Sequence, residues 1–316
     1  MARRKPRGRP VSGILVLNKP AGITSNDALQ RAKYLFYAAK AGHTGSLDPM
    51  ATGVLPVCFG EATKFTQFLL DADKTYVSTF RFGVTTATGD AEGDILEQRS
   101  ADALTEASVE AAMEPLRGDI LQTPPMYSAL KKDGVPLYKL AREGVEVERE
   151  PRPVSIYQFS LLAFRPGEVA EADVEVRCSK GTYVRTLAED LGAALGCGGH
   201  VSRLHRSRAG CFTDADTITL DQLAALREGK RGEDLDFLLN PVDKAVGHLM
   251  SVDLPESMAW YFRRGQPVMA PKVYRDAREG DIVRIFADSG DFLGVGEVLE
   301  DGRLTPRRLV VTDMAG

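Results

Sequence analysis

The sequence predicts a protein of the α/β class, in its α+β form, with a small β module at the carboxyl end. Three observations support this prediction. The chain has 316 residues, enough for one large domain or for a large domain and a small one. Helical and strand-like patterns of apolar residues alternate from residue 13 to residue 227. After residue 255 the pattern becomes β-rich, in short pieces separated by Gly and Asp.

The composition excludes several classes of protein. Hydrophobic residues make up 43% and charged residues 27% of the chain, which excludes disorder, collagen and coiled coil as descriptions of the whole. No apolar run approaches the roughly 18 residues of a membrane span. The first ten residues are basic, but the apolar stretch at 13–17 is too short for a signal peptide, so we expect a cytoplasmic protein. The net charge of −4 argues against indiscriminate coating of nucleic acid, although it allows a local basic groove.

In the first half of the chain, strands and helices are expected to alternate. The short apolar run at 13–17 ends at a Lys-Pro-Ala-Gly turn, and helical spacing begins at Ser25, which we expect to be an N-cap. Residues 76–84 alternate as a strand with one buried face does. The expected strands are 13–17, 54–59 and 76–84, and the expected helices begin at Ser25, near Ala62 and at Thr105.

The second half contains an irregular segment followed by further regular elements. Residues 117–153 are rich in Pro, Gly and charge, and we expect them to leave the core. Strands are then expected at 154–164, 172–179 and 201–208, and helices at 182–195 and 219–227. The tail strands at 282–286, 292–299 and 309–311 indicate a small barrel-like module.

The cysteines and histidines do not form a metal-binding pattern. No C-x-x-C pair occurs, and the four histidines are scattered, which argues against a structural zinc site. We therefore expect buried free thiols at Cys58, Cys178, Cys197 and Cys211.

The segment with the most chemical information is the loop GHTGSLDPMATG, residues 42–53. Its three glycines and its proline allow sharp turns and a close approach to a ligand. It lacks the Lys of a phosphate-binding P-loop. One carboxylate, Asp48, and one imidazole, His43, lie within it. On residue type alone, an Asp before Pro is more often a turn former than a catalyst.

The same loop resembles the catalytic signature of the TruB family of tRNA pseudouridine-55 synthases. The resemblance continues in order along the chain, although Asn18 stands where the family commonly has Asp. The matching blocks are LNKPAGITS (17–25), GHTGSLDPMATGVLPVCFGEATK (42–64), TYVSTFRFGVTTATGDAEG (75–93), QTPPMYSALKKDGVPLYKLAREG (122–144), RCSKGTYVRTLAEDLG (177–192), VSRLHRSRAGCF (201–212) and GEVLEDGRLTPRRLV (296–310).

The resemblance implies a fold, a domain organisation and a reaction. The fold would be a mixed, largely antiparallel sheet flanked by helices, followed by a PUA-type module. A basic tail (1–12) would precede a catalytic domain (13–250) with an RNA-gripping insertion (about 117–153), and an RNA-binding module (251–316) would end the chain. The reaction would convert uridine 55 in the T loop of tRNA to pseudouridine. Because the product is an isomer, no cofactor or metal is expected. We also expect a monomer that acts without an obligatory protein partner.

The resemblance also implies roles for individual residues. Asp48 would be the nucleophile, and Arg185 would lower its pKa and hold its orientation. From residue type alone, Arg185 would instead be an exposed helical residue that pairs with Glu189. Tyr76 would supply an aromatic face to the extruded uracil, or move a proton, where residue type alone predicts a core tyrosine.

The remaining roles concern substrate binding. Tyr183 and Leu204 would line the uracil pocket, and His43, uncharged or partly charged, would contact the target nucleotide or its neighbours. Lys19 and Pro20 would brace the active-site loop. The cations expected on RNA phosphates are Lys131, Lys132, Arg203, Arg206 and Arg208, though a solvated face is the simpler explanation for the two lysines.

Three alternatives stay open from the sequence. One is a guide-RNA-dependent relative that modifies ribosomal RNA, although the chain lacks a long Lys-rich extension. Another is a tRNA-binding or tRNA-folding module without essential catalysis. The third is a nucleoside hydrolase, which would need a metal or a second catalytic carboxylate.

Overall fold

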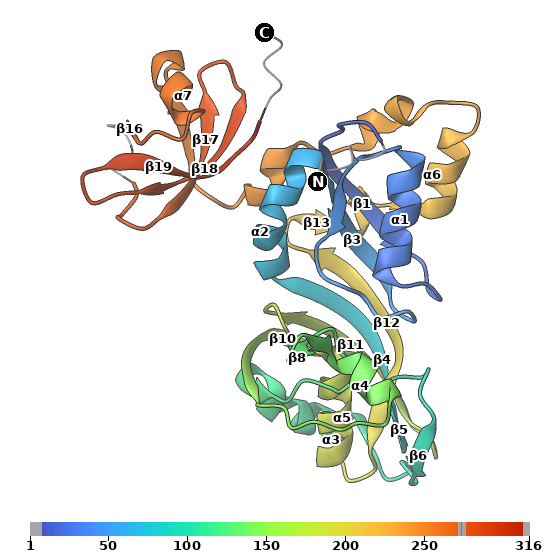
Figure 1. Cartoon of the computed structure of the whole chain (residues 1–316). Helices are drawn as coiled ribbons and strands as arrows, with labels where there is room; N and C mark the ends of the chain where they lie inside the picture. Colours follow the sequence, from blue (N-terminus) through green and yellow to red (C-terminus); the bar gives the residue numbers. More distant parts are fainter. Residues whose placement is uncertain (1–7, 271–272, 274–275, 312–316) are drawn as a thin grey trace.

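A computed structural model describes residues 8–270, 273 and 276–311 of the chain (Figure 1). Two sheets organise these residues. A ten-stranded sheet runs through the larger part of the molecule, and a five-stranded sheet forms the carboxyl-terminal part. Within the described residues, no helix combines the length and apolar character needed to cross a membrane.

The large sheet is mixed and largely antiparallel, which confirms the predicted fold class. Its order is β14-β1-β3-β12-β4-β11-β10-β7, with β2 paired to β3 and β13 paired to β12. Only the β1–β14 and β3–β12 pairs are parallel. The bounds are β1 (Gly13–Lys19), β2 (Ala41–His43), β3 (Thr52–Phe59), β4 (Lys74–Phe82), β7 (Gly118–Gln122), β10 (Arg152–Arg165), β11 (Glu171–Cys178), β12 (Gly199–Ala209), β13 (Phe212–Thr213) and β14 (Ile218–Thr219).

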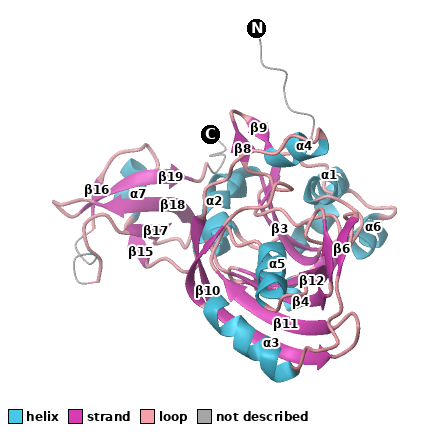
Figure 2. Ribbon diagram, turned by 90° about the horizontal axis from the view of Figure 1, so that it is seen from below, coloured by secondary structure: helices cyan, strands magenta, loops and turns pink. Residues whose placement is uncertain are grey.

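Helices cover both ends of this sheet. In both views α6 lies beside α1, and α3 lies beside α5 (Figures 1 and 2). α6 contacts β14 at one end of the sheet, α5 packs mainly against β12 in its middle, and α3 also contacts β10. The helices are α1 (Ser25–Leu35), α2 (Thr66–Asp71), α3 (Glu106–Met113), α4 (Leu137–Arg142), α5 (Val184–Ala194) and α6 (Leu220–Arg227). The 3-10 helices are η1 (Gly60–Phe65), η2 (Glu114–Leu116), η3 (Asp214–Asp216), η4 (Gly232–Leu238) and η5 (Val242–Val246).

The helix starts follow the capping rules, with one correction. Thr105 and Thr219 are the N-caps of α3 and α6, as predicted. For α1 the N-cap is Thr24, whose hydroxyl accepts the Asp27 N–H, so the prediction of Ser25 is wrong by one residue. The Ser25 side chain is buried and bonds to the 42–53 loop instead.

The segment 117–153 only partly leaves the core. Its first residues form β7, which pairs with β10 as the last strand of the large sheet, so the predicted excursion begins too early. The excursion proper holds the hairpin of β8 (Lys131–Lys132) and β9 (Val135–Pro136), followed by α4. A second hairpin, β5 (Val84–Thr86) with β6 (Ile95–Gln98), follows β4.

The carboxyl-terminal sheet has the order β15-β17-β18-β19-β16 and is curled, as a PUA-like module would be. Its strands are β15 (Ser251–Leu254), β16 (Val268–Met269), β17 (Ile282–Ala287), β18 (Phe292–Val298) and β19 (Arg303–Leu309), with α7 (Glu256–Phe262) beside them. The predicted strand at 309–311 is therefore displaced. Val310 instead packs with the apolar cluster that joins this sheet to η1, where the Phe65 and Phe292 rings lie 5.4 Å apart.

The apolar residues of β1 and β3 explain why both faces of the sheet are covered there. In β1, Leu15 and Leu17 belong to the main core, whereas Ile14 and Val16 belong to a second cluster on the opposite face. Alternate side chains of a strand point to opposite faces, so a strand that is apolar throughout needs cover on both sides. The main core lies under α1 and α5, and the second lies under η1 and α2.

A glycine at the start of β3 allows the close approach of β12. Gly53 has φ +106°, and a Cβ at this position would overlap the backbone carbonyl of Arg206. We expect Gly53→Ala to lower the free energy of unfolding by about 3 kcal/mol or more, because backbone atoms must shift. Gly22, with φ +83° and open space around it, is the matched control. Gly22→Ala should cost only about 1 kcal/mol in denaturant unfolding, and equal losses would contradict this account.

Candidate active site

Helix α1 and a buried lysine, Lys19, hold the loop at 42–53 in place. The Ser25 hydroxyl accepts the Leu47 N–H at 2.7 Å and faces the Leu47 carbonyl at 3.1 Å. The Lys19 ammonium, which is fully buried, donates to the carbonyls of Pro20, Ile23 and Pro49 at 2.8, 2.8 and 3.1 Å. Lys19 therefore fixes the residue next to Asp48, and Pro20 contributes only its carbonyl. Burial lowers the pKa of Lys19 to about 8, while the charge of Asp48 opposes this.

Asp48 and Arg185 form an ion pair at the centre of the site. The Arg185 Nε lies 2.9 Å from Oδ2 of Asp48, and Nη2 lies 3.3 Å from Oδ1. The same guanidinium donates to the carbonyls of Thr88 and Tyr127, each at 2.7 Å, and lies 3.7 Å from the Asp90 carboxylate. Its side chain is 4% exposed, whereas that of Asp48 is 36% exposed. The arginine is thus enclosed by protein, and the carboxylate reaches the surface of the site.

Two opposing effects act on the pKa of Asp48: burial raises it, and Arg185, as expected, lowers it. Burial raises the pKa of Asp48 above its usual range, and the Arg185 guanidinium opposes this rise without reversing it. Asp90 adds to the rise, because its negative charge disfavours ionisation of a second carboxylate nearby. The alternative pairing of Arg185 with Glu189 is not among the ion pairs of the described residues.

Two strands and one helix bring the remaining uracil-pocket candidates to this carboxylate. On the sheet, Tyr76 lies directly opposite Arg206, and Ser78 opposite Leu204, so all four side chains share a face. Tyr183 precedes α5, where its backbone exchanges two hydrogen bonds with the Gln122 side chain at 2.7 and 3.0 Å. Burial raises the pKa of both phenols, and the charge of Asp48 acts in the same direction.

His43 ends β2, at the entrance of the loop. Its Nδ1 atom is buried and has no hydrogen-bond partner among the described residues. Burial, assisted by the charge of Arg206, lowers the pKa of His43, so the ring is neutral at pH 7. A neutral imidazole with a free ring nitrogen can accept or donate one hydrogen bond to a bound ligand.

The prediction that Arg206 contacts phosphate is wrong for this structure. The side chain is 1% exposed, and it donates to the carbonyls of Val54 and Gly45 at 2.8 and 3.1 Å. Arg206 therefore ties Gly45, within the 42–53 loop, to Val54, just after it, from inside the protein.

The other four predicted phosphate contacts are exposed, but they lie apart. Lys131 and Lys132 form β8, at the tip of the insertion. Arg203 and Arg208 lie opposite Thr79 and Thr75, on the face of the sheet away from Tyr76. RNA bound at Asp48 therefore does not meet these two arginines on the same face, and their role remains a prediction.

Sequence reasoning missed several residues that shape the site. Asp90 lies within a matching block but was not singled out, and its 5% exposure marks it as part of the ion-pair network. Behind the loop, Nδ1 of His205 lies 2.8 Å from the Thr52 hydroxyl, and Nε2 lies 3.0 Å from Asp214. Residues 201–208 were predicted as a strand and as a source of positive charge, and neither pattern shows that His205 bonds to Thr52 and Asp214, which lie elsewhere in the sequence.

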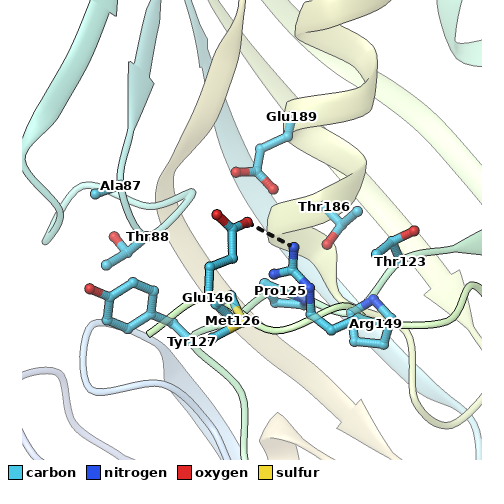
Figure 3. A pocket seen from close by; sticks show the side chains of 11 residues that line it. Ala87, Thr88, Thr123, Pro125, Met126, Tyr127, Glu146, Arg149, Thr186 and Glu189 are labelled. Atoms are coloured by element: carbon cyan, nitrogen blue, oxygen red, sulfur yellow. Dashed lines mark ion pairs between the residues drawn. The ribbon is translucent and has the colours of Figure 1, made fainter. Parts of the chain in front are cut away.

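A cavity of about 340 Å³ adjoins the buried arginine (Figure 3). It lies between the 123–127 segment, α5 and the loop after β5, and its walls include Thr88 and Tyr127, the residues whose carbonyls hold Arg185. Two residues of its lining, Arg149 and Thr186, each carry a buried polar atom, Nε and Oγ1 respectively, without a hydrogen-bond partner among the described residues.

Comparison with known proteins agrees with this arrangement. Residues 33–184 match the family described as TruB family pseudouridylate synthase (N terminal domain). Residues 185–247 match the tRNA pseudouridylate synthase B C-terminal domain, and residues 251–310 match Pseudouridine synthase II TruB, C-terminal. The chain belongs to the TruB family.

Individual relatives are similar over nearly their whole length. The chain is 59% identical over 310 residues to tRNA pseudouridine synthase B of Saccharophagus degradans, covering 98% of this chain and 99% of that protein. It is 53% identical over 310 residues to the protein of that name from Pseudomonas aeruginosa, with the same coverage. A crystal structure of a Cbf5-Nop10-Gar1 complex has a TM-score of 0.70 at 27% identity, covering 95% of this chain and 84% of that one.

The buried position of Arg206 can be tested by unfolding in denaturant. We expect Arg206→Met to lower the free energy of unfolding by about 2 kcal/mol or more, because buried carbonyls lose their donor. Arg203→Met, at an exposed position of the same strand, should change it by less than about 0.5 kcal/mol. Equal effects would show that Arg206 is not a structural residue.

The ion pair in this TruB-family site predicts the titration of Asp48. Replacing Arg185 with Gln removes the charge that opposes burial, so the pKa of Asp48 should rise further. The carboxyl ¹³C resonance of Asp48, followed against pH, measures this shift. Arg177→Gln removes an exposed arginine and should leave the titration unchanged. An unchanged or lowered pKa in Arg185→Gln would contradict the proposed electrostatics.

Proposed function

We propose that this TruB-family chain converts uridine 55 in the T loop of tRNA to pseudouridine, with Asp48 as the nucleophile. The observation that carries the proposal is the Asp48–Arg185 ion pair. A carboxylate that reaches solvent is held in one orientation by an arginine whose other donors are taken by backbone carbonyls. The relatives named tRNA pseudouridine synthase B support tRNA as the substrate.

The reaction needs little more than a positioned carboxylate. The N1–C1′ bond of uridine breaks, the base turns, and a C5–C1′ bond forms. The hydrogen on C5 leaves as a proton, and N1 gains one, so atoms and electrons balance without a co-reactant. Asp48 must be ionised to attack C1′ or C6, or to assist formation of a glycal. Since its pKa is raised, activity is expected to fall as pH drops through that value.

The pocket side chains would receive the extruded base. Extrusion costs a few kcal/mol, and stacking on an aromatic ring returns about 1–3 kcal/mol per base. Tyr76 is the stacking face we assign, with Tyr183 and Leu204 as walls. His43, neutral and with a free ring nitrogen, would hydrogen-bond the target nucleotide or a neighbour. Lys19 and Pro20 would act only by bracing the loop.

The insertion would hold the RNA over this pocket. Lys131 and Lys132 are exposed at its tip and are the phosphate contacts we retain there. The cavity beside Arg185 has room for part of a nucleotide next to the target. Recognition by loop shape and backbone contacts is the usual mode for folded RNA.

The proposal also covers the roles of the two domains, the location of the protein and its assembly state. We assign residues 13–250 to catalysis and 251–316 to RNA binding, in a cytoplasmic monomer that acts without an obligatory protein partner. The likeness to Cbf5, which was crystallised in a complex with Nop10 and Gar1, favours one alternative, a synthase that works only within an assembly. Activity of the purified chain on bare tRNA separates the two.

The test is release of tritium from tRNA labelled at uridine C5. The wild type should release tritium without cofactor or guide RNA, and Asp48→Asn should release none, since an amide is not a nucleophile. The variant should still bind tRNA. Asp71→Asn, which alters an exposed carboxylate paired with Lys180, is the matched control and should keep full activity.

The substrate control is a transcript that lacks the T-loop uridine, which should release nothing above background. Substantial release by Asp48→Asn would remove Asp48 as the nucleophile. No release by the wild type, despite tight binding of tRNA, would leave a binding module or a partner-dependent enzyme.

A further inference from the structure

The large sheet consists of two halves that are paired at one short contact. The first half holds β14, β1, β3 and β2, and the second half holds β12, β4, β11, β10, β7 and β13. Among the described residues the halves pair only through β3 and β12, where Thr52 lies opposite His205 and Gly53 opposite Arg206. Figure 1 shows β12 running from the part that holds β1 and β3 into the part that holds β10 and β11. A parallel pair this short has few backbone hydrogen bonds, so side-chain contacts at the junction help to fix the two halves.

The candidate active site spans this junction. Asp48 lies in the loop between β2 and β3, which belong to the first half. The groups around it belong to the second half: Tyr76 lies on β4, Leu204 lies on β12, and Arg185 lies on α5, which packs against β12. The position of one half relative to the other therefore sets the distances between Asp48 and these side chains.

Two consecutive residues of β12 bridge the junction from opposite faces of the sheet. Arg206, on the face of Tyr76, donates to two carbonyls of the first half. His205 lies opposite Val77, and its side chain is therefore on the other face. The Nδ1 atom of His205 lies 2.8 Å from the hydroxyl of Thr52, the first residue of β3. The Thr52–His205 hydrogen bond thus joins the two halves on the face away from the pocket.

Asp214 fixes the orientation of the His205 ring. The Nε2 atom lies 3.0 Å from Oδ1 and 3.1 Å from Oδ2 of Asp214. A ring nitrogen that faces a carboxylate acts as the donor, so in the neutral ring Nδ1 accepts from the Thr52 hydroxyl. Asp214 begins η3, which connects β13 of the second half to β14 of the first. The Thr217 hydroxyl donates to the Asp214 carbonyl at 2.7 Å and so closes this turn.

We propose that His205 is a positioning residue for the reaction at Asp48. Through its bonds to Thr52 and Asp214, it sets the place of the loop that carries Asp48 relative to the second half of the sheet. This inference rests on the proposed function for the identity of the reaction. The His205 and Asp214 side chains are 34% and 47% exposed, so their pairing adds little to the stability of the fold. A displacement of about 1 Å can nevertheless slow a reaction by about 100-fold.

The experiment measures the single-turnover rate of tritium release at saturating tRNA, together with the dissociation constant for tRNA. Thr52→Val removes the hydroxyl and keeps the branched shape, and His205→Gln keeps a donor for Asp214 but has no polar atom at the place of Nδ1. Each variant should lower the rate by about tenfold or more and leave the dissociation constant within about twofold of the wild type. The double variant should be no slower than the slower single variant, because both substitutions break the same bond.

A conservative variant and a matched control separate positioning from general loss of structure. His205→Asn places an amide near the position of Nδ1 and should react about threefold or more faster than His205→Gln. Ser202→Ala removes the 3.1 Å hydrogen bond from the Ser202 hydroxyl to the Thr79 carbonyl, which lies within the second half, and should keep the wild-type rate. The thermal midpoints of all these variants should lie within about 3 °C of the wild type.

Hydrogen exchange of the backbone amides in residues 50–56 gives a readout that does not depend on turnover. Exchange there should be faster in His205→Gln than in the wild type, and unchanged in Ser202→Ala. A wild-type rate in His205→Gln, losses that multiply in the double variant, or an equal loss in Ser202→Ala would overturn the proposal. So would unchanged exchange, or a loss confined to tRNA affinity. A failure of the proposed reaction would appear separately, as wild-type protein that releases no tritium while exchange still responds to His205→Gln.

Discussion

The buried guanidinium of Arg185 is the interaction on which the rest of the site depends. Four segments that are far apart in the sequence meet at this one side chain: the 42–53 loop, the loop after β5, the insertion and α5. A buried charge is costly unless it is paired and fully hydrogen-bonded. Here two carbonyls and two carboxylates meet that requirement together, so each segment is needed to stabilise the position of the others.

Two further buried cations, Lys19 and Arg206, shape the 42–53 loop. Lys19 donates to the Pro49 carbonyl of the loop and to two carbonyls of the turn after β1. Arg206 donates to carbonyls of the loop and of β3. Glycine and proline give that loop its sharp turns, but they leave carbonyls without partners in regular secondary structure. Charged donors from β1 and β12 satisfy those carbonyls. Arg206, which the sequence suggested as an RNA-binding cation, thus helps to hold the loop that carries Asp48 instead.

The limits of prediction from sequence follow from these contacts. The positions of most strands and helices were predictable, because apolar periodicity and threonine caps are local signals. The order of the strands in the sheet was not predicted, because it depends on contacts between distant segments. The roles of Arg206 and Arg208 were not predicted either. Strict alternation would put both on one face of β12, but a bulge between them leaves Arg206 opposite Tyr76 and Arg208 opposite Thr75. Ser25 was wrongly predicted as the N-cap of α1 for a related reason. Either Thr24 or Ser25 could cap the helix, but the Ser25 hydroxyl is bonded to Leu47, a contact distant in sequence, and Thr24 is the cap.

The two partners of the ion pair differ in exposure to solvent, and this difference determines which of them a ligand can reach. Arg185 is closed to solvent before any ligand binds, whereas Asp48 keeps 36% of its side-chain surface exposed. RNA that covers Asp48 removes water from the carboxylate alone and brings phosphate charge nearer, and both changes raise its pKa further. The arginine then opposes a larger rise in the pKa of Asp48 than it does in the free protein. Its charge also acts more strongly, because the surroundings have a lower dielectric constant once water is removed. In the proposed reaction, a preformed, enclosed cation would therefore be what keeps the carboxylate ionised once the substrate covers the site.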